Sequence, residues 1–241
     1  MRSYKCRGIV LNTIKYGEKA IIVQMLTDTL GRQSYIVQGV ASSKGRSSKM
    51  AHFQPLFALN FEGLVSDKSD LHRLKDVESG IVLRTLPYDV KKSTIALFMA
   101  EVLYRLIAES EPNQSLFDFV WGSIEALDTI DEGVANFHLW FLSNISRFLG
   151  FAPGNEYVQG AFFDMREGLY TTIQPLHDKF FSREQSCLFT DMLECDVLCL
   201  GEIGLNRAQR VDMLSALVEY YKVHLESIKK VQSIHILQEV F

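Results

Sequence analysis

The first third of the chain alternates short apolar runs with turn-forming residues. Five segments of strand length occur between Lys5 and Glu78, and glycine-containing or polar breaks separate them. β-Branched and aromatic residues, which strands favour, are frequent in these segments. The segments read KCRGIVLNTI, KAIIVQMLTD, RQSYIVQG, HFQPLFALNFEG and LHRLKDVES. Five short strands in about 75 residues predict a small barrel, and the OB-fold is a five-stranded barrel of this kind.

After Pro87 the apolar residues repeat at helical spacing. A first amphipathic helix is expected to reach Ile107, and Ser115 with Asp118 resembles a capping box that opens a second helix. A third helix, from Val134 to Leu149, is apolar on most sides. Such a helix is typical of the buried centre of a helical bundle.

Residues 155–176 interrupt the helical pattern with two short strand-like segments. The runs AFFDM and LYTTI flank the turn REG, which predicts a β-hairpin from Ala161 to Ile173. Beyond the hairpin, Asn206 with Gln209 predicts the start of another helix, and a last short helix is expected from Ser233. The pattern as a whole predicts an α+β multidomain chain.

The charge distribution divides the chain near residue 80. Residues 1–80, the expected OB-fold domain, carry twelve Lys and Arg and seven Asp and Glu, a net charge of +5. Residues 81–241, the expected mainly α-helical domain with its hairpin insertion, carry thirteen and twenty-two, a net charge of −9. This asymmetry predicts an anionic partner for the N-terminal domain alone.

No apolar run approaches the roughly 18 residues that would span a bilayer, and the N-terminus lacks the apolar core of a signal peptide, so we expect a cytoplasmic protein. The four cysteines are too few for a disulfide framework in a chain of this size. Cys195 and Cys199 would share one face of a helix, and with His177 they would permit a metal site. No CxxC pair occurs, and the alternative is that Cys187, Cys195 and Cys199 are buried apolar residues. We therefore expect no metal and no cofactor.

Signatures of enzyme chemistry are absent from the sequence. No GxSxG, HExxH, Walker A or GxGxxG pattern occurs, and the six histidines have no ligand or triad spacing. Neighbouring acids such as Asp131 and Glu132 fall at predicted helix ends, where a solvated surface role is usual. We expect no catalytic residues and a protein that is not an enzyme.

The stretch GVASSKGRSSKM, residues 39–50, is the most distinctive polar segment of the expected barrel. Its cations Lys44, Arg46 and Lys49 stand among glycines and serines, whose backbone N–H and hydroxyl groups suit a phosphate. Segments rich in Gly and Ser are also frequent as flexible linkers. On composition alone both interpretations stand.

The order of motifs around this segment resembles the N-terminal region of the RecO family of bacterial recombination mediators. The ending YYKVHLESIKKVQSIHILQEVF is also similar to the family's last two helices, so the resemblance covers essentially the whole chain. The matching N-terminal positions are Gly17-Glu18, Leu26-Thr27, Gly31-Arg32, Gly39 with Lys44 and Arg46, and Phe53-Gln54-Pro55.

The resemblance implies an OB-fold followed by a helical domain, binding of single- and double-stranded DNA, strand annealing, and loading of a recombinase with RecR. Four cations are then expected to contact phosphates: Arg32, Lys44, Arg46 and Lys49. Tyr35 and Phe53 would stack on bases if exposed, and core packing is the alternative for both. A different class of function also remains open, in which the protein is a protein-only adaptor whose barrel binds a partner and whose basic loop is a linker.

The family's contact with the acidic, apolar-tipped tail of single-stranded DNA-binding protein implies an apolar pocket with a cationic rim on the helical domain. Its candidate rim cations are Arg105, Arg147, Lys222 and Lys229. Two features depart from the family pattern. The zinc module of many relatives is replaced after Leu149-Gly150-Phe151 by the cysteine-free hairpin segment, and Gln38 stands where relatives often have a cation.

Overall fold

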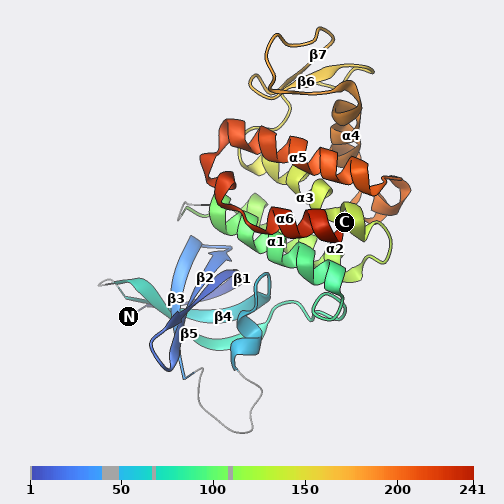
Figure 1. Cartoon of the computed structure of the whole chain (residues 1–241). Coiled ribbons are helices and arrows are strands. Elements are labelled where there is room, and N and C mark those ends of the chain that lie inside the picture. The colour runs from blue at the N-terminus through green and yellow to red at the C-terminus, as the bar shows by residue number, and fades with distance from the viewer. Residues whose placement is uncertain (1, 40–48, 67–68, 108–110) are drawn as a thin grey trace.

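The strands of the N-terminal part close into a barrel with the order β1-β2-β3-β5-β4 (Figure 1). The computed structural model describes residues 2–39, 49–66, 69–107 and 111–241. The barrel strands are β1 Arg2–Tyr16, β2 Ala20–Thr27, β3 Gly31–Gln38, β4 Ala58–Ser66 and β5 Ser69–Ser79. The short 3₁₀ helix η1, Lys49–Phe53, precedes β4. The predicted five-stranded OB-fold barrel is thus confirmed.

The barrel core follows from the two-residue period of its strands. On β2, Ile21, Val23 and Met25 alternate inward and are buried, while the residues between them are half-exposed. Tyr35 of β3 is fully buried in the same core, and its hydroxyl lies 2.8 Å from the hydroxyl of Tyr4. The two hydroxyls satisfy each other, which removes the cost of an unpaired polar group inside the barrel.

The rest of the chain is mainly helical, with α3 at its centre (Figure 1). All nine residues of α3 are buried, and it packs against α1, α2, α4 and α5. This confirms the buried helix that the sequence predicts within 134–149. The helices are α1 Val90–Leu106, α2 Gln114–Thr129, η2 Val134–Asn136, α3 Phe137–Ile145, η3 Ser146–Phe148, α4 Arg183–Glu194, η4 Val197–Glu202, α5 Arg207–His224, η5 Glu226–Lys230 and α6 Ser233–Val240.

The barrel has a core of its own, and a second face of the barrel contributes to the core of the helices. Ile9 and Leu26 of the barrel belong to the same buried cluster as Phe98 of α1 and Phe117 of α2. The guanidinium of Arg7 in β1 lies over the Phe117 ring, 5.0 Å from its centroid. The charge boundary near residue 80 therefore separates the secondary-structure types, while the core continues across it.

The segment between β5 and α1 is held to the end of α2 by Asp128. Its carboxylate accepts hydrogen bonds from the backbone N–H groups of Arg84 (2.9 Å), Thr85 (2.9 Å) and Leu86 (2.7 Å). The Nζ of Lys92, a residue only 3% exposed, donates to the Asp128 carbonyl at 2.9 Å and to the Thr85 hydroxyl at 2.8 Å. Asp128 thus holds the connection through both its carboxylate and its backbone carbonyl.

The start of α2 differs from the expected capping box. The N-cap is Asn113, whose side chain accepts from the N–H of Leu116 at 3.0 Å. Asp118 instead accepts hydrogen bonds from the side chains of Gln114 and Arg7. The prediction from Ser115 and Asp118 was therefore wrong by two residues, because Asn113, an N-cap residue as good as Ser, already starts the helix.

A small sheet with the order β7-β6-β8 lies beside α4, at the end of the molecule away from the barrel (Figure 1). Strands β6 Phe162–Asp164 and β7 Leu169–Thr171 form the predicted hairpin, and β8 Phe180–Phe181 adds a third strand. Helix α4, which the sequence pattern did not indicate, begins with a capping box between Ser182 and Gln185. None of the helices in the described ranges is long and apolar enough to cross a membrane.

Candidate nucleic-acid interface

The two ends of β3 have different surroundings. Arg32, near its start, contacts the end of α1, where its guanidinium donates to the Tyr104 and Ile107 carbonyls at 2.9 and 2.8 Å. The other end lies about 20 Å further along the strand, at roughly 3.3 Å per residue. There the N–H of Gly39 donates to the Lys19 carbonyl in the β1–β2 turn at 2.8 Å. We call this end of the barrel, away from the contact with α1, its free end.

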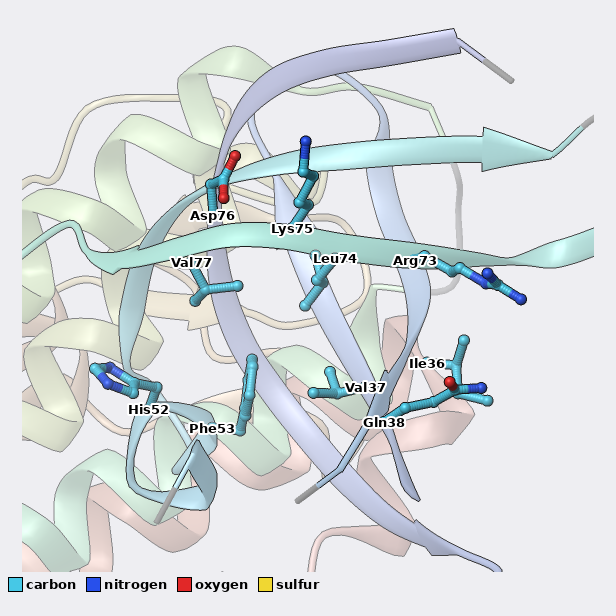
Figure 2. Close-up of a pocket in the computed structure, with 10 residues that line it drawn as sticks. All are labelled: Ile36, Val37, Gln38, His52, Phe53, Arg73, Leu74, Lys75, Asp76 and Val77. Carbon is cyan, nitrogen blue, oxygen red and sulfur yellow. The ribbon is translucent and has the colours of Figure 1, made fainter. Parts of the chain in front are cut away.

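A groove of about 450 Å³ opens between β3, η1 and β5 (Figure 2). The side chains of Val37, Phe53, Leu74 and Val77 converge on it from three elements. Phe53 is 5% exposed, and the other three are half-buried. The groove therefore has an apolar floor that continues into the barrel core.

The groove exists because β3 and β5 pair over only a short distance. Their parallel register runs from Ser34↔Leu71 to Ile36↔Arg73 and does not continue beyond it. The β4–β5 register then shifts, so that Asp76 and Val77 stand against a single residue of β4, and Asp76 adopts a φ of 49°. Such a bulge re-aims side chains. Leu74 and Val77 consequently both face the groove, while Asp76 points away from it (Figure 2).

Cationic side chains surround the free end of the barrel. Arg73 is exposed at the end of the groove nearest Gln38 (Figure 2), and none of the other described residues hydrogen-bonds its guanidinium. Lys15 and Lys19 are exposed at the β1–β2 turn. Lys75 is exposed on β5, with its Nζ 4.0 Å from the Glu62 carboxylate. Solvated cations beside an apolar groove are the arrangement with which barrels of this kind hold nucleic acid.

Comparison with known proteins identifies the family. Residues 1–80 match the family model described as "Recombination protein O N terminal", and residues 87–156 match "Recombination protein O C terminal". The chain is similar to the "DNA repair protein RecO" of Phocaeicola vulgatus (37% identity) and of Bacteroides fragilis (37%), over 98% of each chain. That of Flavobacterium psychrophilum is 35% identical, again over 98% of both chains. The chain belongs to the RecO family.

Membership of the RecO family supports a function in DNA repair by recombination. Two of the four predicted phosphate contacts, Arg32 and Lys49, lie within the described residues. Arg32 is engaged at the junction with α1, where it also lies 4.4 Å from the centroid of the Tyr104 ring. Lys44 and Arg46 lie outside the described residues. Lys49 begins η1, and its side chain is outside the description as well. Arg32 therefore lies at the opposite end of β3 from the barrel's free end. Phosphate contacts by Lys44, Arg46 and Lys49 stay predictions.

The two predicted aromatic contacts belong to the barrel interior. Tyr35 is fully buried, with its ring edge-on to Phe61 at 5.2 Å, so it packs in the core and cannot stack on a base. Phe53 is also buried, although one side of it borders the groove. Sequence reasoning missed Arg73 at the groove and Tyr16, which is 53% exposed beside the β1–β2 turn. The sequence did carry a signal for Tyr16, because an aromatic residue next to the turn glycine Gly17 indicates an exposed position.

A separate hollow of about 290 Å³ lies between α5, η5 and α6 on the helical part of this RecO-family protein. Val218, Ile228 and Val231 supply apolar surface, and Lys222 and Lys229 stand beside it. Each lysine also has an acidic neighbour three residues away, at 2.7 Å for Lys222 and 3.5 Å for Lys229. Two of the four predicted rim cations are thus brought together.

The other two predicted rim cations lie elsewhere. Arg105 is at the end of α1, with its guanidinium 5.3 Å from the centroid of the Tyr104 ring. Arg147, in η3, donates to the Leu193 carbonyl at the end of α4 at 2.8 Å. Neither lines the hollow between α5 and α6.

The cysteines do not form a cluster. Cys195 ends α4 and Cys199 lies in η4, so the two do not share a helix face as expected, and Cys187 and Cys199 are exposed and not buried. His177 pairs with Asp164 at 3.1 Å. Within the described ranges no three His, Cys, Asp or Glu side chains are grouped to hold a metal ion.

Proposed function

We propose that the protein is a recombination mediator that binds single- and double-stranded DNA through the free end of its barrel. In this role it promotes annealing of complementary strands and, with RecR, loading of the recombinase. The observation that carries the proposal is the groove between β3 and β5 in a chain of the RecO family, with exposed Arg73 at its end, which pairs with none of the described residues. The family match supports the repair function, and the groove with its surrounding cations supports the mode of binding.

The charge distribution fits binding to the phosphate backbone. Residues 1–80 carry a net charge of +5, whereas residues 81–241 carry −9 and would repel DNA at low salt. Contacts between solvated cations and phosphates release counterions and carry no sequence information. We therefore expect affinity that depends steeply on salt and little on sequence.

Removing two cations from the free end should reduce this salt dependence. In the variant Lys19→Ala with Arg73→Ala, each lost phosphate contact lowers the magnitude of the slope of log affinity against log salt by about 0.7 for single-stranded DNA. We expect a combined decrease of about 1.4, and an affinity at low salt lower by about tenfold. Fluorescence anisotropy of a labelled oligonucleotide over a salt series measures both quantities.

The matched control removes two exposed cations from the helical part, Arg166 and Lys230, and should leave the slope unchanged. Equal effects of the two double variants would contradict the placement of the interface on the barrel. Salt-insensitive binding, or none, in the unsubstituted protein would favour the protein-only adaptor. We propose no catalytic step, and cleavage of the labelled DNA with a divalent metal present would contradict this.

The sequence-predicted cations Lys44 and Arg46 belong to the same proposal. The segment that carries them joins Gly39 to Lys49, and described residues on both sides of it, Gln38 and His52, line the groove. We propose that the two cations add phosphate contacts to those of Lys19 and Arg73. All the proposed phosphate contacts then belong to residues 1–80, which carry the net positive charge.

We further propose that the hollow between α5, η5 and α6 receives the acidic, apolar-tipped tail of single-stranded DNA-binding protein. The variant Lys222→Glu with Lys229→Glu reverses both rim charges while keeping the apolar floor. We expect at least about tenfold weaker binding of a labelled peptide that has an acidic stretch and an apolar C-terminal residue, because reversed charges at a rim repel the partner. Fluorescence anisotropy of the peptide measures the change.

The control for the tail site is Arg147→Glu, which reverses a charge outside the hollow. It should leave peptide affinity within about twofold of the unsubstituted value at moderate salt, because Arg147 does not line the hollow and solvated charges away from a site are screened. Weakening by Arg147→Glu alone, with no effect of the double variant, would place the tail on η3 and not in the hollow.

A further inference from the structure

The floor of the groove is apolar surface that the barrel leaves exposed to solvent. Val37, Leu74 and Val77 pack against the barrel core on one side and are only half-buried on the other. They converge with Phe53 on one space, and the bulge at Asp76 brings Val77 to the same side as Leu74 (Figure 2). Exposed apolar surface of this kind is typical of a binding site, where a bound ligand covers it.

The two ends of the groove are polar. Figure 2 shows His52 at one end of the apolar floor and Gln38 with Arg73 at the other. In the part of the chain that the structure describes, no side-chain hydrogen bond engages these three residues, and Gln38 and Arg73 are exposed. The imidazole and the amide each offer a donor and an acceptor, and the guanidinium offers donors only.

A nucleobase matches this arrangement in shape and chemistry. It is flat and apolar on its faces, it is polar at its edges, and it is joined to phosphates outside the ring. The groove volume of about 450 Å³ lies within the range of roughly 300–1,000 Å³ found for small-molecule sites. A base on the floor would have its edges near His52 and Gln38, and its flanking phosphate near Arg73.

We propose that the gap between β3 and β5 takes up one unstacked nucleobase of single-stranded DNA. The inference rests on the proposed DNA binding by the barrel and adds that a base, and not only the backbone, is held. The bases of a duplex are stacked and paired, so they cannot enter without the cost of unstacking. The groove therefore makes the protein prefer single strands over duplexes of equal charge.

The test compares two single-stranded oligonucleotides of the same length and charge. One is intact, and in the other abasic sites replace the bases of the central nucleotides. We expect the unsubstituted protein to bind the intact strand about tenfold more tightly, within the range found for a base held by a protein side chain. Both strands should show the same salt slope, because their phosphates are the same.

Filling the groove should abolish this preference. The variant Val77→Trp places a large side chain on the floor, and His52→Trp blocks one end from a half-buried position that makes no side-chain hydrogen bond within the described ranges. In either variant we expect the intact and abasic strands to bind equally, with an unchanged salt slope. Val158→Trp, at a residue 58% exposed in the helical part, is the matched control and should keep the preference.

The outcomes separate the two proposals. Binding of neither strand by the unsubstituted protein would overturn the proposed function. Equal binding of both strands would overturn the nucleobase site and leave DNA binding standing. If Val77→Trp fails to fold, His52→Trp decides, and a tenfold preference retained in a folded His52→Trp variant would also overturn the site.

Discussion

Asp128→Ala is expected to lower the free energy of unfolding by about 3 kcal/mol, the largest effect that we predict. The carboxylate accepts N–H groups from three successive residues of the connection between barrel and helices, Arg84 to Leu86. Alanine leaves these donors without their partner, and at the buried Leu86 an unsatisfied N–H costs about 1–3 kcal/mol. The part-buried donors of Arg84 and Thr85 add to this loss. The hydrogen bond from the buried Lys92 ammonium goes to the backbone carbonyl of Asp128, so alanine retains that contact.

The same carboxylate predicts a pH dependence. Burial by itself would raise the pKa of Asp128, but the N–H donors of Leu86, Arg84 and Thr85 outweigh burial and lower the pKa below its ordinary value. A lowered pKa in the folded state contributes stability that is fully present above about pH 4, the pKa range of an unfolded Asp, and is lost as the pH falls through the folded value. The difference between the two proteins should therefore shrink in acid.

Urea unfolding followed by circular dichroism at pH 7 and at several values below pH 4 measures both effects. Asp131→Ala is the matched control, since Asp131 is an exposed acid near the same connection. It should change the free energy of unfolding by less than about 0.5 kcal/mol. A loss of similar size in both variants, or a difference that grows in acid, would contradict the role assigned to Asp128.

Arg32→Ala is expected to lower the free energy of unfolding by about 2 kcal/mol while leaving DNA affinity nearly unchanged. The guanidinium donates to two carbonyls at the end of α1 and lies over the Tyr104 ring. Carbonyls at a helix end have no partner within the helix, so their hydrogen bonds to a charged group are worth about 1.5–3 kcal/mol. The cation–π contact adds about 0.5–1 kcal/mol, and relaxation offsets part of the sum.

Arg73→Ala supplies the opposite pattern and is the matched comparison. Arg73 is exposed and unpaired within the described ranges, so its removal should weaken DNA binding and leave stability within about 0.5 kcal/mol. Thermal unfolding and the anisotropy salt series, run on both variants, separate the two roles. A smaller slope of log DNA affinity against log salt in a fully stable Arg32→Ala protein would contradict this assignment. It would show that Arg32 contacts phosphate, as the sequence predicts.

Element types were predictable wherever the local pattern was strong. On β2, every second residue from Ile21 to Met25 is apolar because that face of the strand is buried. Helix α3 is apolar on most sides because all of its residues are buried. The capping box of Asn206 and Gln209 also marks the start of α5 correctly. Helix α4 was missed because its segment REQSCLFTDMLE has few apolar residues, although Ser182 and Gln185 were a readable start signal.

The candidate site was much less predictable, because its members come together through long-range pairing. The groove depends on where the β3–β5 ladder stops, and no local pattern marks Ile36 and Arg73 as its last pair. The bulge that turns Val77 toward the groove depends on the register with β4. Sequence reasoning consequently favoured the cations of the basic segment and did not single out Arg73.

By itself, the sequence determined the order of strands and helices, the charge asymmetry between barrel and helices, and the motifs of the RecO family. These properties are local or additive, so they can be read without knowledge of what packs against what. Only the tertiary structure decided which cation is exposed and which is engaged with the helices. Both Arg32 and Arg73 are cations within strand-like segments of the sequence. In the folded protein, Arg32 donates to the carbonyls of Tyr104 and Ile107, whereas Arg73 is exposed to solvent.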